Sequence, residues 1–155
     1  MSLIIATGSN LDNRLKNLQT AKESLSSCFK LIEESNIYTS KAVDYENQPD
    51  FYNQVLSFES PNIHPDDLMS KLLSIESELG RTRDIDKGPR IIDIDMLFFD
   101  SHTSNTDHLT LPHPRLFERS FVVLPLMELS CFKELSINYE FSKTFNNSAT
   151  VLLYN

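Results

Sequence analysis

The sequence predicts an α+β fold in which helices cover one face of an antiparallel sheet. Short apolar or alternating runs are typical of strands, and two longer segments carry apolar residues at helical spacing. Their order is strand, helix, strand, strand, helix, strand, which is the split β-α-β arrangement called ferredoxin-like. With 155 residues and 17.8 kDa the chain has the size of one domain, and we expect residues 1–155 to form it.

The first half of the chain supplies three of these strands and one helix. An apolar run at residues 3–7 predicts a buried first strand. Apolar and polar residues alternate over 29–39 and again over 51–60, which predicts two further strands. Between the first two strands lies a predicted helix, for which Asn10 and Asp12 are available as caps. Its apolar stripe consists of leucines: Leu11, Leu15, Leu18 and Leu25.

The second helix has clear signals at both ends. Pro65 suits the first position of a helix, and Gly80 suits the position just beyond its end. The residues between them include an apolar stripe: Leu68, Leu72, Ile75 and Leu79. Residues 91–99 are apolar apart from two aspartates, so we expect a central strand there. After a hairpin-like segment that ends at Leu111, the pattern weakens, and we expect the remainder to be an extension packed on the same domain.

Composition disfavours several classes of protein. Fourteen Lys and Arg against 22 Asp and Glu give a net charge of −8, which opposes nonspecific binding to nucleic acid or to an anionic membrane. Three glycines lie too far apart for a dinucleotide fingerprint or a phosphate-binding loop. Cys28 and Cys131 lack metal-binding spacing, and we expect reduced thiols in the core. We expect a cytoplasmic monomer that binds neither nucleic acid nor membranes, because no signal-peptide pattern or membrane-spanning run is visible.

The segment GPRIIDIDML, residues 88–97, contains the strongest chemical motif. Residues two apart in a strand face the same side, so Asp93 and Asp95 would place two carboxylates on one face roughly 7 Å apart. Such a pair suits hard divalent cations, and two magnesium ions about 3.5–4 Å apart would fit between them. A D-x-D pair can also mark the solvent face of an edge strand. The apolar residues around it favour the metal-binding interpretation.

Arginines flank this segment. Arg81 and Arg83 follow the second helix, and Arg90 precedes the strand. As surface residues they would form ion pairs that contribute little to stability. Near the aspartates, their guanidinium groups would match phosphate oxygens and stabilise charge in phosphoryl transfer. Strict alternation points Arg90 away from Asp93, so such a clamp requires Arg90 to lie in the turn before the strand.

These motifs together resemble the 6-hydroxymethyl-7,8-dihydropterin pyrophosphokinase family. The resemblance runs over nearly the whole chain and includes GSNL at 8–11, QPDFYN at 48–53, Glu76, GRTR at 80–83, GPRIIDID at 88–95, LPHP at 111–114 and RSF at 119–121. It implies a ferredoxin-like transferase of folate biosynthesis. Such an enzyme moves the pyrophosphoryl group of ATP to the hydroxymethyl group of the pterin and releases AMP.

The resemblance also implies roles for individual residues. Asp93 and Asp95 would bind two Mg²⁺ ions, and Arg81 and Arg90 would position ATP and stabilise the transition state. The pterin would be bound by Ser40, Val43, Phe51, Asn53 and Phe121, with its ring between the two phenylalanines. ATP would be bound by Glu76, Arg83, Thr110, His113 and Arg119.

The chain departs from the family pattern near these sites. Leu73 stands where glutamine is familiar, so we expect adenine recognition to depend more on backbone groups. Lys41 and Lys87 stand where proline and tryptophan are familiar. Two other classes stay open. A non-catalytic binding module would show no metal-dependent affinity for nucleotides. A D-x-D nucleotidyl or glycosyl transferase would need a longer chain, and a polymerase would need a basic track.

Overall fold

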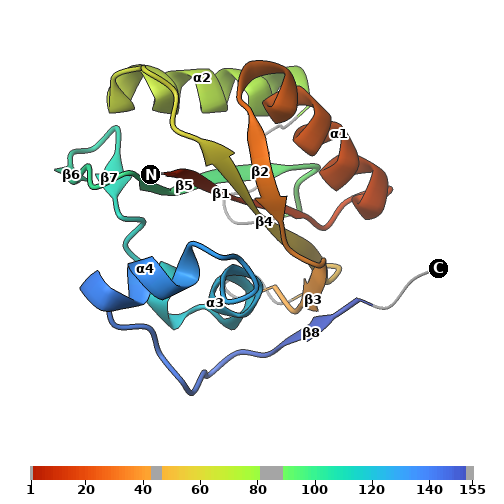
Figure 1. Cartoon of the computed structure of the whole chain (residues 1–155). Coiled ribbons are helices and arrows are strands. Elements are labelled where there is room, and N and C mark those ends of the chain that lie inside the picture. The colour runs from red at the N-terminus through yellow and green to blue at the C-terminus, as the bar shows by residue number, and fades with distance from the viewer. Residues whose placement is uncertain (1, 43–46, 81–88, 153–155) are drawn as a thin grey trace.

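Figure 1 shows the computed structural model of the chain, which describes residues 2–42, 47–80 and 89–152. In this part of the chain a six-stranded antiparallel sheet runs through the molecule, with helices on either side. The predicted α+β class with an antiparallel sheet is confirmed. The expectation that helices cover only one face is wrong, because the extension after residue 111 supplies helices for the second face.

Two long strands form the centre of the sheet. β1 (Ser2–Ser9) pairs along its whole length with β4 (Phe51–Glu59). β5 (Asp93–Phe99) pairs with the free side of β1, and both β2 (Leu31–Glu34) and β3 (Tyr38–Ser40) pair with the free side of β4. The strand order therefore matches the split β-α-β arrangement predicted from the sequence.

The strand predicted over 29–39 is divided into β2 and β3 by Ser35. The Ser35 N–H donates to the Val55 carbonyl (2.9 Å), while the Ser35 hydroxyl oxygen accepts from the Val55 N–H (3.0 Å). The Ser35 carbonyl in turn accepts from the Gln54 side chain (2.8 Å). A serine side chain thus takes over part of the ladder, and the pairing register shifts between Leu31 and Glu33.

β5 lies at the end of the sheet, so the prediction of a central strand is wrong. Its apolar residues are buried because helices cover both faces of the strand, which sequence alone cannot distinguish from a strand with two neighbours. Its outer edge is protected by other groups. The His113 N–H donates to the Leu97 carbonyl (3.1 Å), and the Ile94 N–H donates to the Glu76 carboxylate (2.6 Å).

Two helices cover one face of the sheet, α1 (Arg14–Cys28) and α2 (Pro65–Glu78). Pro65 and Gly80 take the predicted positions, and Gly80 has the positive φ (95°) that favours glycine after a helix. The cap of α1 is Asn13, whose side chain accepts from the Lys16 N–H (3.1 Å). The predicted caps Asn10 and Asp12 are therefore wrong.

The other face is covered by α3 (Ser120–Leu126) and α4 (Phe132–Asn138), which follow a short 3-10 helix, η1 (Leu116–Glu118). The predicted hairpin-like segment forms β6 (Ser104–Asn105) and β7 (Thr110–Leu111). Near the C-terminus, β8 (Ala149–Val151) pairs with β3 and extends the sheet.

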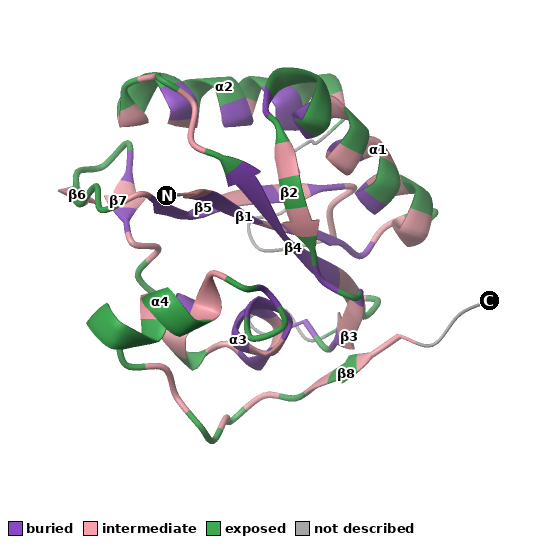
Figure 2. Ribbon diagram, in the orientation of Figure 1, coloured by how far each residue is buried: buried purple, intermediate pink, exposed green. Residues whose placement is uncertain are grey.

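The sheet separates two hydrophobic clusters, seen as buried segments on both of its sides in Figure 2. The larger cluster lies under α1 and α2 and includes Leu18, Leu72 and Phe58. Cys28 is exposed, so its predicted place in the core is wrong, and Cys131 is half-buried. Among the described helices, none is long and apolar enough to cross a membrane.

Candidate active site

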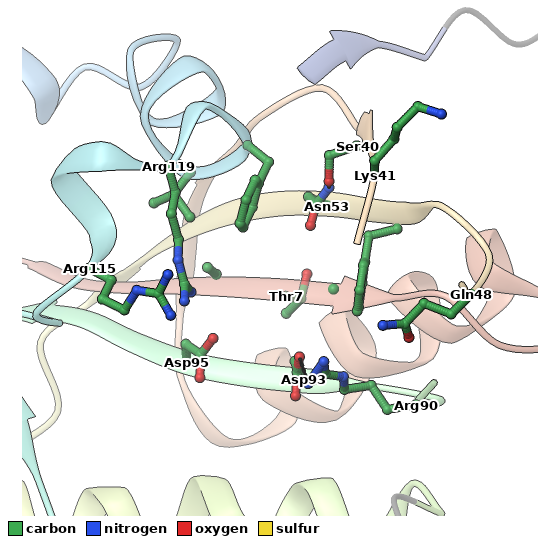
Figure 3. A pocket seen from close by; sticks show the side chains of 15 residues that line it. Thr7, Ser40, Lys41, Gln48, Asn53, Arg90, Asp93, Asp95, Arg115 and Arg119 are labelled. Atoms are coloured by element: carbon green, nitrogen blue, oxygen red, sulfur yellow. Dashed lines mark hydrogen bonds and ion pairs between the residues drawn. The ribbon is translucent and has the colours of Figure 1, made fainter. Parts of the chain in front are cut away.

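A cavity of about 180 Å³ opens on the face of the sheet that carries α3 (Figure 3). Most of the site residues predicted from the sequence line it: Ser40, Phe51, Asn53, Arg90, Asp93, Asp95, Arg119 and Phe121. Further residues complete its wall: Ala6, Thr7, Gly8, Lys41, Gln48, Arg115 and Val122. The cavity therefore gathers segments from β1, β3, β4, β5 and the start of α3.

Small residues on the central strand form the floor of the cavity. Gly8 pairs with Asn53 on one side and with Asp93 on the other. Ala6, two residues earlier, pairs with Asp95. Residues paired across antiparallel strands share a face, so the missing and short side chains of β1 leave space between Asn53 and the two carboxylates. The sequence of β1 thus creates the volume that a ligand could occupy.

Asp93 and Asp95 both point into the cavity from β5, as their spacing predicted (Figure 3). In the described part of the chain, no group of three or more His, Cys, Asp or Glu side chains is arranged to enclose a metal ion. Two carboxylates supply only part of an oxygen shell. This donor set fits Mg²⁺, which keeps several waters and takes further oxygens from substrate phosphates.

Arg90 lies in the turn before β5, as the predicted clamp requires. Its Nη1 is 3.3 Å from Asp93 Oδ2, and the side chains of the two residues are 17% and 21% exposed. The guanidinium carbon also lies 5.1 Å from the centre of the Phe51 ring. Arg90 thus connects the carboxylates with an aromatic wall of the cavity.

Asn10 fixes the position of Arg90 through the backbone. Its side-chain oxygen accepts from the Arg90 N–H (2.9 Å), and its own N–H donates to the Arg90 carbonyl (3.2 Å). The side-chain amide of Asn10 donates to Gln48 Oε1 (2.7 Å) and to the Pro49 carbonyl (3.1 Å). Asn10 is completely buried. The sequence suggested only a helix cap here, because its partners are 38 to 80 residues away.

Asn53 lies between the sheet and β3, next to the aromatic side chains of the cavity. Its amide nitrogen donates to the Ser40 hydroxyl (2.8 Å) and to the Tyr38 carbonyl (3.2 Å). Both amide hydrogens are therefore used within the protein. The remaining oxygen lies 3.4 Å from the point where a Cβ of Gly8 would stand, so it faces the floor of the cavity and can accept from a ligand.

Arg115 and Arg119 bring positive charge to the end of the cavity where Asp95 lies (Figure 3). The Arg119 guanidinium carbon lies 5.6 Å from the centre of the Phe121 ring. Arg115 was missed by sequence reasoning, although it directly follows the LPHP motif at 111–114, because that motif drew attention to His113 alone. Arg115 is distant from Asp93 and Asp95 in the sequence, and only the fold brings its positive charge to the same cavity.

His113 lies close to these two arginines without lining the described cavity. Burial and the positive charges of Arg119 and Arg115 lower the pKa of His113 to about 4. The imidazole is therefore neutral at neutral pH and could serve a phosphate or nucleotide only as a hydrogen-bond partner, without adding charge.

Some predicted site residues do not line this cavity, and others fall outside the part of the chain that the structure describes. Thr110 and Glu76 do not line it, and the buried Glu76 carboxylate instead accepts from the Ile94 N–H between the two aspartates. Lys41, one of the departures from the family pattern, does line it. Three predicted site residues and one expected departure fall outside the described residues: Val43, Arg81, Arg83 and Lys87.

Comparison with known proteins identifies relatives that match most of the chain. Residues 4–131 match the 7,8-dihydro-6-hydroxymethylpterin-pyrophosphokinase family. The 2-amino-4-hydroxy-6-hydroxymethyldihydropteridine pyrophosphokinase of Bacillus subtilis (strain 168) is 38% identical over 127 residues, which are 81% of this chain and 75% of that protein. The Aquifex aeolicus (strain VF5) protein of the same name is 36% identical over 128 residues, 83% of this chain and 79% of that protein.

A longer relative is also similar. The folic acid synthesis protein fol1 of Pneumocystis carinii is 43% identical over 130 residues, 83% of this chain. The match covers only 17% of that protein, so most of its length has no counterpart in this chain. The match to residues 4–131, together with the two bacterial relatives that are covered over three quarters of their length, shows that the chain belongs to the 7,8-dihydro-6-hydroxymethylpterin-pyrophosphokinase family.

Proposed function

We propose that this chain transfers the pyrophosphoryl group of ATP to 6-hydroxymethyl-7,8-dihydropterin and releases AMP. The observation that carries the proposal is the pairing of Gly8 with both Asn53 and Asp93. This register supports the proposal, because it sets Asn53, which would bind the edge of the pterin, beside Asp93, which would bind metal-bound phosphates. The family match and the names of the bacterial relatives agree with this activity.

The aromatic side of the cavity suits the pterin. Phe51 and Phe121 offer faces for stacking, and the free oxygen of Asn53 can accept a hydrogen bond from the edge of the ring. Ser40 holds the amide of Asn53 in the orientation that leaves this oxygen available. The pterin hydroxymethyl group would then point across Gly8 toward the carboxylates.

The charged side of the cavity suits the triphosphate of ATP. Asp93 and Asp95 would hold two Mg²⁺ ions, which when bound neutralise the phosphates and the charge that develops during transfer. Arg90, Arg115 and Arg119 supply guanidinium donors around the same space. This local positive charge is needed because the chain as a whole carries −8.

In the proposed reaction, these residues hold the pterin hydroxyl in line with the β-phosphorus of ATP. The hydroxymethyl oxygen forms a bond to the β-phosphorus, and the bond from that phosphorus to the oxygen bridging it to the α-phosphate breaks. AMP leaves with that oxygen, and the proton of the hydroxyl is released. The contribution of the protein is alignment and charge stabilisation, which are the main components of phosphoryl-transfer catalysis.

Several finer assignments belong to the same proposal. Thr110, His113, Arg81, Arg83 and Glu76 would serve the nucleotide, as the family resemblance implies, and Val43 the pterin. The single domain over 1–155, the monomeric state and the cytoplasmic location remain predictions.

The test is phosphorus NMR of ATP incubated with the pterin alcohol and Mg²⁺, in which AMP must appear and ADP must not. We expect Asp95→Ala to lower turnover by about 10²–10³-fold, because a metal ligand in the transition state is lost. The matched control is Asp107→Ala, which removes an exposed carboxylate away from the cavity. Near-normal turnover of Asp95→Ala with a folded protein would refute the metal assignment. ADP formation, or nucleotide binding that ignores Mg²⁺, would contradict the pyrophosphokinase itself.

A further inference from the structure

The C-terminal part of the chain reaches the candidate active site. The family match ends at residue 131, yet Asn147 contacts the start of the helix that carries Arg119 and Phe121. We propose that Asn147 is a positioning residue, which holds these two side chains at the cavity. The inference rests on the proposed function, since it assigns Arg119 to the phosphates and Phe121 to the pterin.

Two hydrogen bonds connect Asn147 with the first residue of α3, and a third connects it with the last residue of η1. The Asn147 side-chain oxygen accepts from the backbone N–H of Ser120 (2.8 Å) and from the Ser120 hydroxyl (2.5 Å). Its amide nitrogen donates to the Glu118 carbonyl (3.4 Å). Ser120 stands between Arg119 and Phe121 in the chain and is only 1% exposed. A contact that fixes the backbone of Ser120 therefore also fixes the backbone from which the side chains of Arg119 and Phe121 project.

α3 lacks a cap from its own sequence. The residue at its N-cap position is Arg119, whose side chain makes no capping hydrogen bond. Short polar side chains normally fill this position and accept from the first N–H groups of the helix. Asn147 provides that acceptor from 27 residues further along the chain. The Arg119 side chain is therefore not used as the cap, and it lines the cavity.

The segment around Asn147 is itself tied to the fold on both sides. Before it, the Ser142 N–H donates to the Phe117 carbonyl (3.3 Å). After it, β8 pairs with β3, where Ala149 is opposite Ser40, and the Leu152 N–H donates to the Ile37 carbonyl (2.7 Å). Asn147 is therefore a brace between the helix with Phe121 and the strand with Ser40, which lie on two sides of the same cavity.

Removal of this acceptor takes away the partner of two donors on the buried Ser120. Such a defect is relieved by loosening of the first turn of α3. The loss of a cap corresponds to about 1 kcal/mol, or roughly a fivefold change in an equilibrium constant. The substrates contact the two side chains already in the ground state, so the change will appear mainly in substrate affinity.

The experiment compares Asn147→Ala, Asn147→Asp and Asn146→Ala. We expect Asn147→Ala to raise the KM for the pterin and for ATP roughly fivefold, with a smaller change in kcat. Asn147→Asp keeps the oxygen that accepts from Ser120, so its KM values should stay within about twofold of the wild type. Asn146 is exposed, and its replacement should change neither constant.

Two further measurements separate positioning from general stability. Hydrogen exchange of the amides of residues 120–123 should accelerate in Asn147→Ala and not in Asn147→Asp. Phe141→Leu disturbs the ring cluster around Phe117 without touching Ser120. It should lower the melting temperature and leave both KM values unchanged. Ser120→Ala, which removes one of the two donors, should shift KM in the same direction as Asn147→Ala by a smaller factor.

Each result decides between the two proposals. Unchanged KM values and unchanged exchange in Asn147→Ala, or an equal rise of KM in Phe141→Leu, would overturn the role of Asn147 and leave the pyrophosphokinase intact. A wild-type protein that forms no AMP would overturn the proposed function. Exchange of residues 120–123 and calorimetric pterin binding would then still decide whether Asn147 positions the helix.

Discussion

Gly8 shows how one missing side chain creates a site. A Cβ at this position would meet Asn53 Oδ1 at 3.4 Å and the Phe51 ring at 3.6 Å. Both distances are ordinary contacts, so the fold has room for a methyl group. That methyl would nevertheless occupy the space between Asn53 and the two carboxylates of β5.

We therefore expect Gly8→Ala to fold and to lose pterin affinity. The KM for the pterin should rise by about tenfold or more, because a bound ring cannot approach the oxygen of Asn53. Steady-state kinetics and thermal unfolding measure the two effects separately. Ser2→Ala is the control, since it lies at the other end of the same strand. A Gly8→Ala enzyme with normal pterin KM would place the ring elsewhere.

At the scale of elements, three loops are joined by Asn10. The loop after β1, the segment before β4 and the turn before β5 meet at its backbone and side chain. The strands bring these loops to one end of the sheet, and the buried amide fixes them relative to one another. Arg90 therefore takes its position from a contact that is not part of the cavity wall.

Asn10→Ala should lower both stability and turnover. The free energy of unfolding should fall by about 2–4 kcal/mol, because several buried hydrogen bonds lose a partner, and kcat should fall because Arg90 is no longer fixed. Urea unfolding and steady-state kinetics measure these quantities. Asn13→Ala provides the comparison. It removes the cap of α1, which contributes about 1 kcal/mol, and should leave kcat unchanged. Equal kcat in the two variants would contradict the role given to Asn10.

β5 shows how an edge strand can be held in place beside the cavity. Glu76 accepts from the Ile94 N–H on its outer edge, and β1 pairs with its inner edge. The strand is thereby held on both sides at the position of Asp93 and Asp95.

At the scale of the whole molecule, stability should depend on the titration of His113. Its pKa is lowered to about 4 in the folded chain, against about 6.5 when unfolded. Above pH 6.5 the ring is neutral in both states. Between pH 6.5 and 4 the unfolded chain binds a proton that the folded chain does not, so the free energy of unfolding falls as the pH falls.

Urea unfolding at pH 7 and pH 5 tests this dependence. In His113→Gln the loss of stability between the two pH values should be smaller than in the wild type by about 1–2 kcal/mol. His102→Gln is the matched control, because His102 is exposed. A His113→Gln variant whose stability changes with pH as in the wild type would show that the ring is not held neutral.

The sequence by itself determined the features that depend on neighbouring residues. The limits of α2 followed from Pro65 and Gly80, and the common face of Asp93 and Asp95 followed from the two-residue period of a strand. The motifs also sufficed to recognise the family. These properties are local, because backbone periodicity and capping act over a few residues.

Only the tertiary structure decided which distant residues meet. It placed β5 at the edge of the sheet and brought Arg115 to the cavity. It also joined three loops through hydrogen bonds to Asn10 and placed Asn147 beside Ser120. No local pattern gives the partners of these residues, since an Asn or Arg side chain can pair with many others. The pairing register of the strands and the packing of the helices select among those partners, and both depend on the whole chain.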